Sequence, residues 1–149
     1  MSGVYLVVWD GSGTVLPCTS GGVPHVTLVY CGRDNVSRGD LLVWGKNCLE
    51  VFSEKEFVLE SAHLNSFHHE KEGRVRHDVL LTLDAESSHM VEKAREILSA
   101  GHPNKSKFSM RQPHVTYSTN WSEEEASLRL SKIRELLPLR VEVVGVTIN

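Results

Sequence analysis

The sequence contains one short pattern twice, Pro-His-Val-Thr-Leu at residues 24–28 and Pro-His-Val-Thr-Tyr at residues 113–117. Each copy lies in a run rich in β-forming residues, so each predicts a β-strand. Successive side chains of a strand point to opposite faces, and the histidine and threonine of one copy therefore share a face. The valine points the other way, with Leu28 and Tyr117 expected on its side, in the core.

Two such strands lying side by side would bring two imidazoles and two hydroxyls around one small anion. An imidazole is usable near neutral pH as a base or as an acid. Cleavage of a phosphodiester needs both, because one group takes a proton from the attacking oxygen and another protonates the departing oxygen. Hydroxyl groups donate hydrogen bonds to the charge that grows on the phosphate oxygens. The candidate catalytic residues are therefore His25, Thr27, His114 and Thr116.

Composition limits the other possibilities. The 149 residues carry a net charge of −3, with 40% hydrophobic and 23% charged residues, which predicts one globular domain over 1–149. There is no basic stripe, so binding of long duplex nucleic acid is disfavoured. The three cysteines, Cys18, Cys31 and Cys48, form no C-x-x-C pattern and are expected to be reduced. With neither a signal peptide nor a membrane span expected, the prediction is a cytoplasmic protein, in the host-cell cytoplasm if it is viral.

The pattern along the chain predicts an α+β fold with a mainly antiparallel sheet. Strands are expected at residues 4–9, 24–30, 56–64, 76–83 and 140–148, besides the second motif strand. Helices are expected within 34–46, with Asn35 or Ser37 as N-cap, over 88–100, capped by Ser87 or Ser88, and from a cap at Ser122 to about Pro138. Residues 65–73 are expected to form an exposed loop between two hairpin strands. The glycine-rich residues 11–22 fit a loop, a plain connection or a flap over the site, and match no nucleotide-binding fingerprint.

The paired His-x-Thr motifs, each followed by a hydrophobic residue, resemble those of the 2H phosphoesterase superfamily, which includes LigT-like RNA phosphodiesterases and cyclic phosphodiesterases. The resemblance covers nearly the whole chain. It implies two pseudo-symmetric lobes of sheet backed by helices, with a central cleft, and the same four catalytic residues. It also implies a phosphodiesterase that acts on a 2′,3′-cyclic phosphate or a 2′-5′ linkage, in RNA processing or in the destruction of an immune signal.

Several residues near the motifs are candidates for substrate binding. Aromatic rings at Tyr5, Tyr30 and Trp121 can stack on a base, with core packing as the alternative. Arg111 and Lys107 can add positive charge near a phosphate, with a solvated surface as the alternative. Ser118 lies two residues past Thr116 and is expected on the same face. The other histidines are weaker candidates: His63 and His77 on the hairpin strands, His68 and His69 in the loop, and His89 and His102 near helix ends.

No metal site and no cofactor are expected, because the histidines have no ligand spacing of a known zinc motif. The expected partner is a nucleotide, a cyclic dinucleotide or a short oligonucleotide, bound by a monomer away from any membrane. Three alternatives stay open: a non-catalytic nucleotide-binding module on the same fold, a tRNA-repair enzyme specific for RNA ends, and a zinc hydrolase built on scattered histidines. Intact histidines and threonines in both motifs argue against the first, because a pure binder needs neither an acid nor a base.

Overall fold

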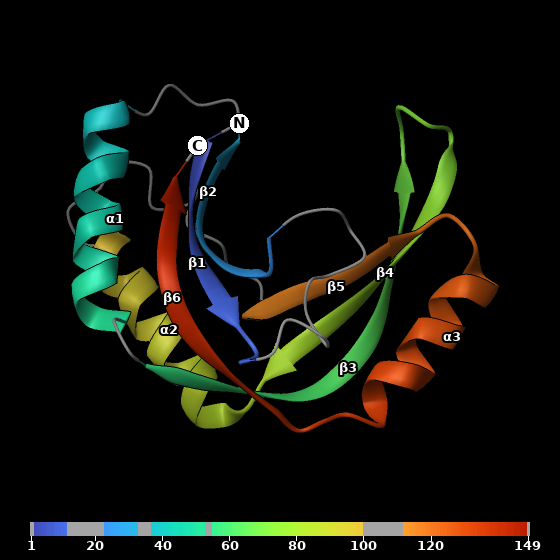
Figure 1. Cartoon of the computed structure of the whole chain (residues 1–149). Helices are drawn as coiled ribbons and strands as arrows, with labels where there is room; N and C mark the ends of the chain where they lie inside the picture. The colour runs from blue at the N-terminus through green and yellow to red at the C-terminus, as the bar shows by residue number, and fades with distance from the viewer. Residues whose placement is uncertain (1, 12–22, 33–36, 53–54, 100–111, 149) are drawn as a thin grey trace.

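The structure, a computed structural model, describes residues 2–11, 23–32, 37–52, 55–99 and 112–148. Its elements follow the expected order of strands and helices (Figure 1). In chain order they are β1 (Ser2–Trp9), β2 (His25–Gly32), α1 (Arg38–Phe52), β3 (Glu56–His69), β4 (Arg74–Leu83), α2 (Ala85–Ser99), β5 (His114–Asn120), α3 (Glu123–Arg134) and β6 (Leu139–Ile148). The predicted α+β class is confirmed for the described residues.

The six strands form one antiparallel sheet that closes on itself in the order β1-β2-β5-β4-β3-β6. The helices lie outside this ring (Figure 1). Helix α1 packs on β1 and β6, α2 on β2 to β4, and α3 on β3 to β5. This order makes β2 and β5, which come from distant parts of the chain, direct neighbours.

Burial separates the two faces of the sheet. In β1 the even-numbered Val4, Leu6 and Val8 are at most 1% exposed, whereas Trp9 is 44% exposed. Val26 of β2 and Val115 of β5 are fully buried as well. These side chains point outward into the core between sheet and helices, where burial of apolar surface stabilises the fold. The opposite face therefore looks into the ring, away from that core.

The helix boundaries differ from the sequence predictions in identifiable ways. Helix α1 extends to Phe52, well past residue 46, and Ser37 receives a hydrogen bond from the Asp40 amide, as expected of an N-cap. Helix α2 begins at Ala85, and its cap is Asp84, which accepts from the Ser87 amide at 2.8 Å. The prediction of Ser87 or Ser88 as that cap is wrong, since Ser87 instead accepts from the Val58 amide of β3.

The hairpin between β3 and β4 is longer than the sequence predicts. Residues 65–69 belong to β3, and the connection is a turn over 70–73, so the loop predicted for 65–73 is wrong at its start. Gly73 closes the turn with a φ of 64°, a conformation that glycine adopts without strain, and its amide donates to the His69 carbonyl. Both faces of this hairpin end are exposed, so the usual alternation of apolar and polar residues is missing.

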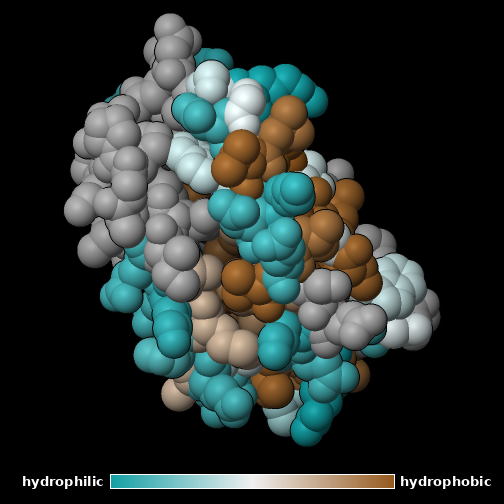
Figure 2. Space-filling view, turned by 90° about the vertical axis from the view of Figure 1, so that its left-hand side faces the viewer, coloured by the Kyte–Doolittle hydropathy of each residue, from teal (hydrophilic) through white to brown (hydrophobic). Residues whose placement is uncertain are grey.

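At the end of the chain the predicted cap and the last strand are confirmed, but α3 ends at Arg134, before the predicted end near Pro138. The Ser122 hydroxyl accepts from the Glu125 amide at 3.3 Å and caps α3, and β6 then runs antiparallel to both β1 and β3. Figure 2 shows the side of the molecule that α1 covers, where apolar side chains are interspersed with hydrophilic ones. Exposed members of α1 include Leu42, Val43, Leu49 and Val51. Among the described helices, none combines the length and the apolar character needed to span a membrane.

Candidate functional site

The two motifs lie on adjacent strands. Val26 of β2 is directly opposite Val115 of β5 in an antiparallel pair. In such a pair the residues on either side are also opposite, which sets His25 against Thr116 and Thr27 against His114. Both valines are buried on the helix side, so all four polar residues share the other face. We call this strand face, which looks into the ring, the motif face.

The two imidazoles are held by the same local contact. Nδ1 of His25 lies 2.7 Å from the carbonyl oxygen of Val23, and Nδ1 of His114 lies 2.9 Å from that of Gln112. A carbonyl oxygen only accepts, so Nδ1 carries the hydrogen in both rings. Nε2 is then the ring nitrogen that gains or loses a proton, and the backbone fixes the tautomer.

Strand pairing extends the motif face into two rows. The first row holds Tyr5 of β1, Thr27, His114, Thr82 of β4 and Ser61 of β3. The second row holds Val7, His25, Thr116, Leu80 and His63 on the same five strands. Each motif residue therefore has a neighbour on both sides, and a bound group between the histidines would have hydroxyl groups of Thr27, Thr116 and Thr82 beside it, with Val7 and Leu80 flanking the motif residues of the second row.

Tyr5 packs directly against one histidine. Its ring meets the His25 ring edge-on, with centroids 5.1 Å apart and an angle of 77° between the planes. Gly3 leaves room for the tyrosine, because a Cβ at this position would lie 2.5 Å from the Tyr5 hydroxyl. Thr147 of β6 stands opposite Tyr5 on its other side. Tyr5 thus lies on the motif face, where a residue predicted to bind the substrate has to lie.

Two hollows open beside the histidines. One, of about 430 Å³, adjoins His114 and is lined by His63, Leu64, Asn65, Leu80, Thr82 and Gln112. The other, of about 320 Å³, adjoins His25 and is lined by Tyr5, Val7, Val23 and Thr147. Each motif histidine therefore borders a hollow of its own, His114 on the side of β3 and β4 and His25 on the side of β1 and β6.

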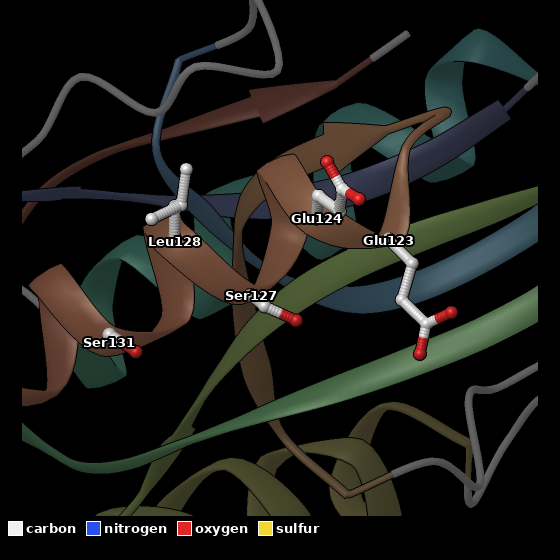
Figure 3. Close-up of a pocket in the computed structure, with 5 residues that line it drawn as sticks. All are labelled: Glu123, Glu124, Ser127, Leu128 and Ser131. Atoms are coloured by element: carbon white, nitrogen blue, oxygen red, sulfur yellow. The ribbon is translucent and has the colours of Figure 1, made fainter.

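A hollow of about 570 Å³ lies elsewhere, on the outer surface of α3 (Figure 3). All its lining residues come from that one helix: Glu123, Glu124, Ser127, Leu128 and Ser131. The two carboxylates point away from each other and repel an anion, and α3 packs on the helix side of the sheet. This hollow therefore has no bearing on the motif residues.

A buried arginine supports one motif from behind. The guanidinium of Arg95, in α2, donates to the Thr27 carbonyl oxygen at 2.7 Å. Arg95 is only 8% exposed, and this burial lowers its pKa, while the nearby Glu92 carboxylate counteracts the shift. Because the hydrogen bond joins α2 to the backbone of the motif strand, it helps to fix the position of Thr27.

The other residues that the sequence predicts for substrate binding do not lie beside the motif histidines in the described structure. Ser118 is wrongly predicted to share a face with Thr116. Val79 of β4 pairs with Ser118 and Leu80 with Thr116, so Tyr117 is an extra residue, a bulge, that turns Ser118 to the helix side, where it is fully buried. Trp121 contacts Arg74 and His69 at the end of the β3–β4 hairpin. The Tyr30 side chain lies outside the described residues, as do Arg111 and Lys107.

Sequence reasoning missed part of this site. Ser61 and Thr82 are absent from the residues that the sequence predicts for the site, and His63 is among the weaker candidates only. The Thr82 hydroxyl lies 2.9 Å from the Ser61 hydroxyl and 3.3 Å from His63 Nε2. Alternation along residues 76–83 does place Thr82 opposite to the buried Leu81 and Leu83, which is the signal that would have found it.

In the part of the chain that the structure describes, no three His, Cys, Asp or Glu side chains come together as a metal-binding group. Cys48 is buried and forms no disulfide, and burial raises the pKa of its thiol to about 12. Neither the known protein-family models nor the curated protein sequences give a match to this chain.

Proposed function

We propose that the chain is a metal-independent phosphodiesterase that uses His25 and His114 as an acid–base pair. Its substrate carries a 2′,3′-cyclic phosphate or a 2′-5′ phosphodiester, in a nucleotide, a short oligonucleotide or a cyclic dinucleotide. The observation that carries this proposal is the pairing of Val26 with Val115, which sets the two His-x-Thr motifs side by side on one face. The finer fold we propose is the two-lobed 2H phosphoesterase arrangement.

The reaction follows from the two imidazoles. Nε2 of one neutral histidine takes a proton from the attacking oxygen, which belongs to water or to a ribose hydroxyl, as that oxygen forms a new bond to phosphorus. The bond from phosphorus to the leaving oxygen breaks, and the second, protonated histidine donates its Nε2 proton to that oxygen. The roles of the two histidines exchange between ring closure and ring opening.

The threonines complete the site in this proposal. The Thr27 and Thr116 hydroxyls donate to the non-bridging phosphate oxygens, whose charge increases in the transition state. The cross-strand pairing supports this role, because the antiparallel register of Val26 with Val115 sets each threonine opposite the histidine of the other motif. The fixed Nδ1 contacts to Val23 and Gln112 support the acid–base role, since they aim a defined nitrogen of each ring.

Product analysis by chromatography in EDTA tests the proposal. The panel contains nucleoside 2′,3′-cyclic phosphates, 2′-5′ oligoadenylate, 3′-5′ oligonucleotides and cyclic dinucleotides. We expect cleavage of one class, lowered about 10²- to 10⁴-fold in His25→Ala and in His114→Ala. Thr27→Val should lower kcat about 10²-fold. His89→Ala, an exposed histidine of α2, is the matched control and should stay at the wild-type rate.

Three results would overturn the proposal. One is the absence of turnover across the whole panel, which would favour a nucleotide-binding module. The second is turnover that both histidine variants retain, which would assign the activity to other residues. The third is activity that EDTA abolishes and zinc restores, which would instead favour a metal-dependent hydrolase.

A further inference from the structure

The motif face continues beyond the histidines toward the β3–β4 hairpin end. The β3–β4 ladder has no register shift between residues 61 and 69. Alternate residues of β3 therefore follow His63 on the same face, and their partners in β4 follow Leu80. These residues are Asn65, Phe67 and His69 in β3, and Asp78, Arg76 and Arg74 in β4. One continuous strand surface thus leads from the hollow beside His114 to the hairpin end.

Side chains at this end form a cluster of stacked rings and guanidinium groups. Arg74 Cζ lies 4.1 Å from the centroid of the Trp121 ring, and Arg76 Cζ lies 4.4 Å from that of Phe67. The His69 ring joins the two pairs, at 5.5 Å from Trp121 and 6.4 Å from Phe67. We call these five residues the arginine–aromatic cluster.

The cluster leaves planar groups open to solvent. Trp121 is 39% and Phe67 is 36% exposed. Aromatic rings and arginine guanidinium planes are the surfaces on which proteins stack unpaired nucleobases. Such stacking tolerates any base, because every base has a flat face, so the cluster suits a single strand rather than one defined sequence.

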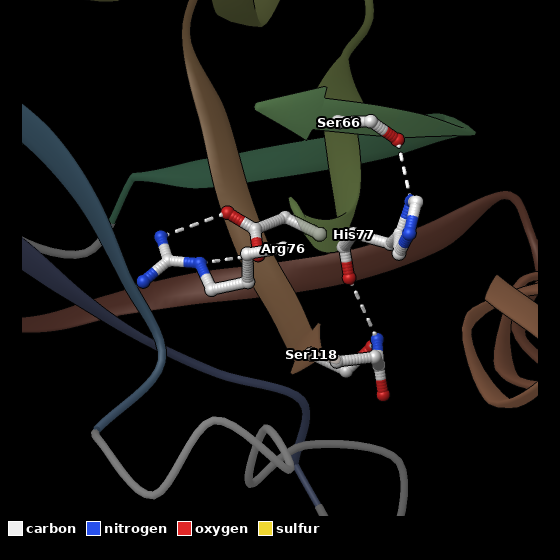
Figure 4. Close-up of polar contacts among 6 residues, drawn as sticks. Ser66, Arg76, His77 and Ser118 are labelled. Carbon is white, nitrogen blue, oxygen red and sulfur yellow. Dashed lines mark hydrogen bonds and ion pairs between the residues drawn. The ribbon is translucent and has the colours of Figure 1, made fainter. Parts of the chain in front are cut away.

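The two arginines differ in how tightly a carboxylate neutralises their charge. Arg76 donates two hydrogen bonds to the Asp78 carboxylate, at 2.9 and 3.0 Å, and Asp78 is only 5% exposed (Figure 4). This pair fixes the plane of the Arg76 guanidinium over Phe67. Arg74 lies 3.7 Å from Glu72, and both side chains are about half exposed. An exposed pair of this kind is weak, so Arg74 can exchange its carboxylate for a phosphate.

The distance from the histidines sets the size of the ligand. Thr116 and Trp121 are separated along β5 by a stretch that spans roughly 13–16 Å, at about 3.3 Å per residue and with one residue taken up by the bulge. A mononucleotide whose phosphate lies at the histidines places its base nearer to them than this. A linear strand of several nucleotides, lying along β3 and β4, reaches this far.

We propose that the arginine–aromatic cluster is a distal subsite for a base of a linear single-stranded oligonucleotide whose reacting phosphate lies between His25 and His114. The inference rests on the proposed function and narrows its substrate class to oligonucleotides. The hollow lined by His63, Asn65 and Thr82 would hold the intervening nucleotide.

Binding is tested first, independently of cleavage. A fluorescein-labelled octamer of single-stranded RNA is titrated by anisotropy in about 0.15 M NaCl against the His25→Ala, His114→Ala protein, with and without Trp121→Ala. We expect Trp121→Ala to raise Kd about tenfold, and Trp121→Phe, which keeps a ring, to restore most of the affinity. Arg74→Gln should lower the slope of log Kd against log salt. Leu128→Ala, at an exposed position of α3, is the control.

Cleavage is then compared in the wild-type background for the octamer and for a dinucleotide with the same reacting linkage. Trp121→Ala should raise KM about tenfold for the octamer and leave the dinucleotide unchanged. Two outcomes would overturn the subsite. One is equal affinity for the octamer in the proteins with and without Trp121→Ala, and the other is a rise in KM that is the same for the octamer and the dinucleotide. Weaker octamer binding in Trp121→Ala, together with no cleavage of any substrate, would keep the subsite and reject only the proposed catalysis.

Discussion

The hydroxyl oxygen of Thr82 lies 3.3 Å from Nε2 of His63. Thr82 also stands directly opposite His114 on the neighbouring strand, and its hydroxyl contacts that of Ser61 at 2.9 Å. A hydroxyl can donate to one partner while it accepts from another. Thr82 therefore lies between the motif residue His114 and a third histidine, His63, and all three residues line the same hollow.

Replacement of Thr82 by valine tests this junction. The variant keeps the shape of the side chain but removes the hydroxyl, which leaves Ser61 and His63 without this hydrogen-bonding partner. We expect kcat/KM to fall about tenfold and the free energy of unfolding to fall by about 1 kcal/mol. Steady-state kinetics and urea unfolding measure the two effects. Thr82→Ser should recover activity. With a dinucleotide substrate, Thr119→Val, beyond the bulge on the same face, should change activity little. Equal losses in both valine variants would contradict the role of Thr82.

Arg95 offers a test of how the motif strand is held. Arg95→Met keeps much of the apolar stem but removes the hydrogen bond to the Thr27 carbonyl oxygen, so that oxygen loses a charged donor in a buried site. We expect the free energy of unfolding to fall by about 2 kcal/mol. Urea unfolding should show this loss, whereas Arg129→Met, which breaks an exposed pair with Glu125, should cost about 0.5 kcal/mol or less. Similar values for the two variants would argue against a supporting role of Arg95.

Cys48 should resist alkylation while the protein is folded. Burial raises the pKa of its thiol to about 12, and the reactive thiolate is therefore nearly absent at pH 8. Because the folded-state pKa is the higher one, the contribution of this thiol to stability is complete below the ordinary pKa of about 9 and is lost as the pH rises toward about 12. Iodoacetamide followed by peptide mass spectrometry should modify Cys48 only after unfolding in urea. Rapid modification of the native protein would show that the thiol is accessible.

The aromatic rings of Phe52, in α1, and Phe57, in β3, pack against each other. The rings pack edge to face with centroids 5.7 Å apart, and both are at most 1% exposed. Phe52→Ala should lower the free energy of unfolding by about 3–5 kcal/mol, because it removes buried apolar atoms and leaves a cavity. Urea unfolding measures the loss, and Phe52→Leu should cost less because it fills more of the space. A loss below about 1 kcal/mol in the alanine variant would mean that the site collapses around the smaller side chain.

The sequence was sufficient for the features that depend on local periodicity. Alternation predicted that His25 and Thr27 share a face opposite Val26, and hydrogen-bonding side chains predicted the cap at Ser122; the structure confirms both. The sequence was insufficient where contacts with residues distant along the chain determine the local structure. The β3–β4 hairpin end has two exposed faces and shows no alternation of apolar and polar residues. Its strands are nevertheless held by cross-strand contacts, such as that between the Ser66 hydroxyl oxygen and Nδ1 of His77, which lie 2.7 Å apart.

The same limit applies to the site. The hydroxyl of Ser87 was predicted to cap its own helix, but it accepts a hydrogen bond from the Val58 amide of another element, which no local pattern reveals. The position of Trp121 likewise depends on Arg74 and His69, which approach it from the hairpin. Ser118 would share a face with Thr116 in a regular strand, and only the pairing with Val79 and Leu80 shows that it does not.

The extra residue at Tyr117 restricts which insertions and deletions β5 can tolerate. Upstream of it, His114 and Thr116 face into the ring, and downstream Thr119 faces the same way, although an odd number of positions separates the two threonines. Removing one residue here would exchange the inner and outer side chains along half of β5, exposing Val115 or burying His114. Substitutions of Tyr117 should therefore be tolerated far better than its deletion, and related chains should keep the count between His114 and Trp121 even where the residue itself varies.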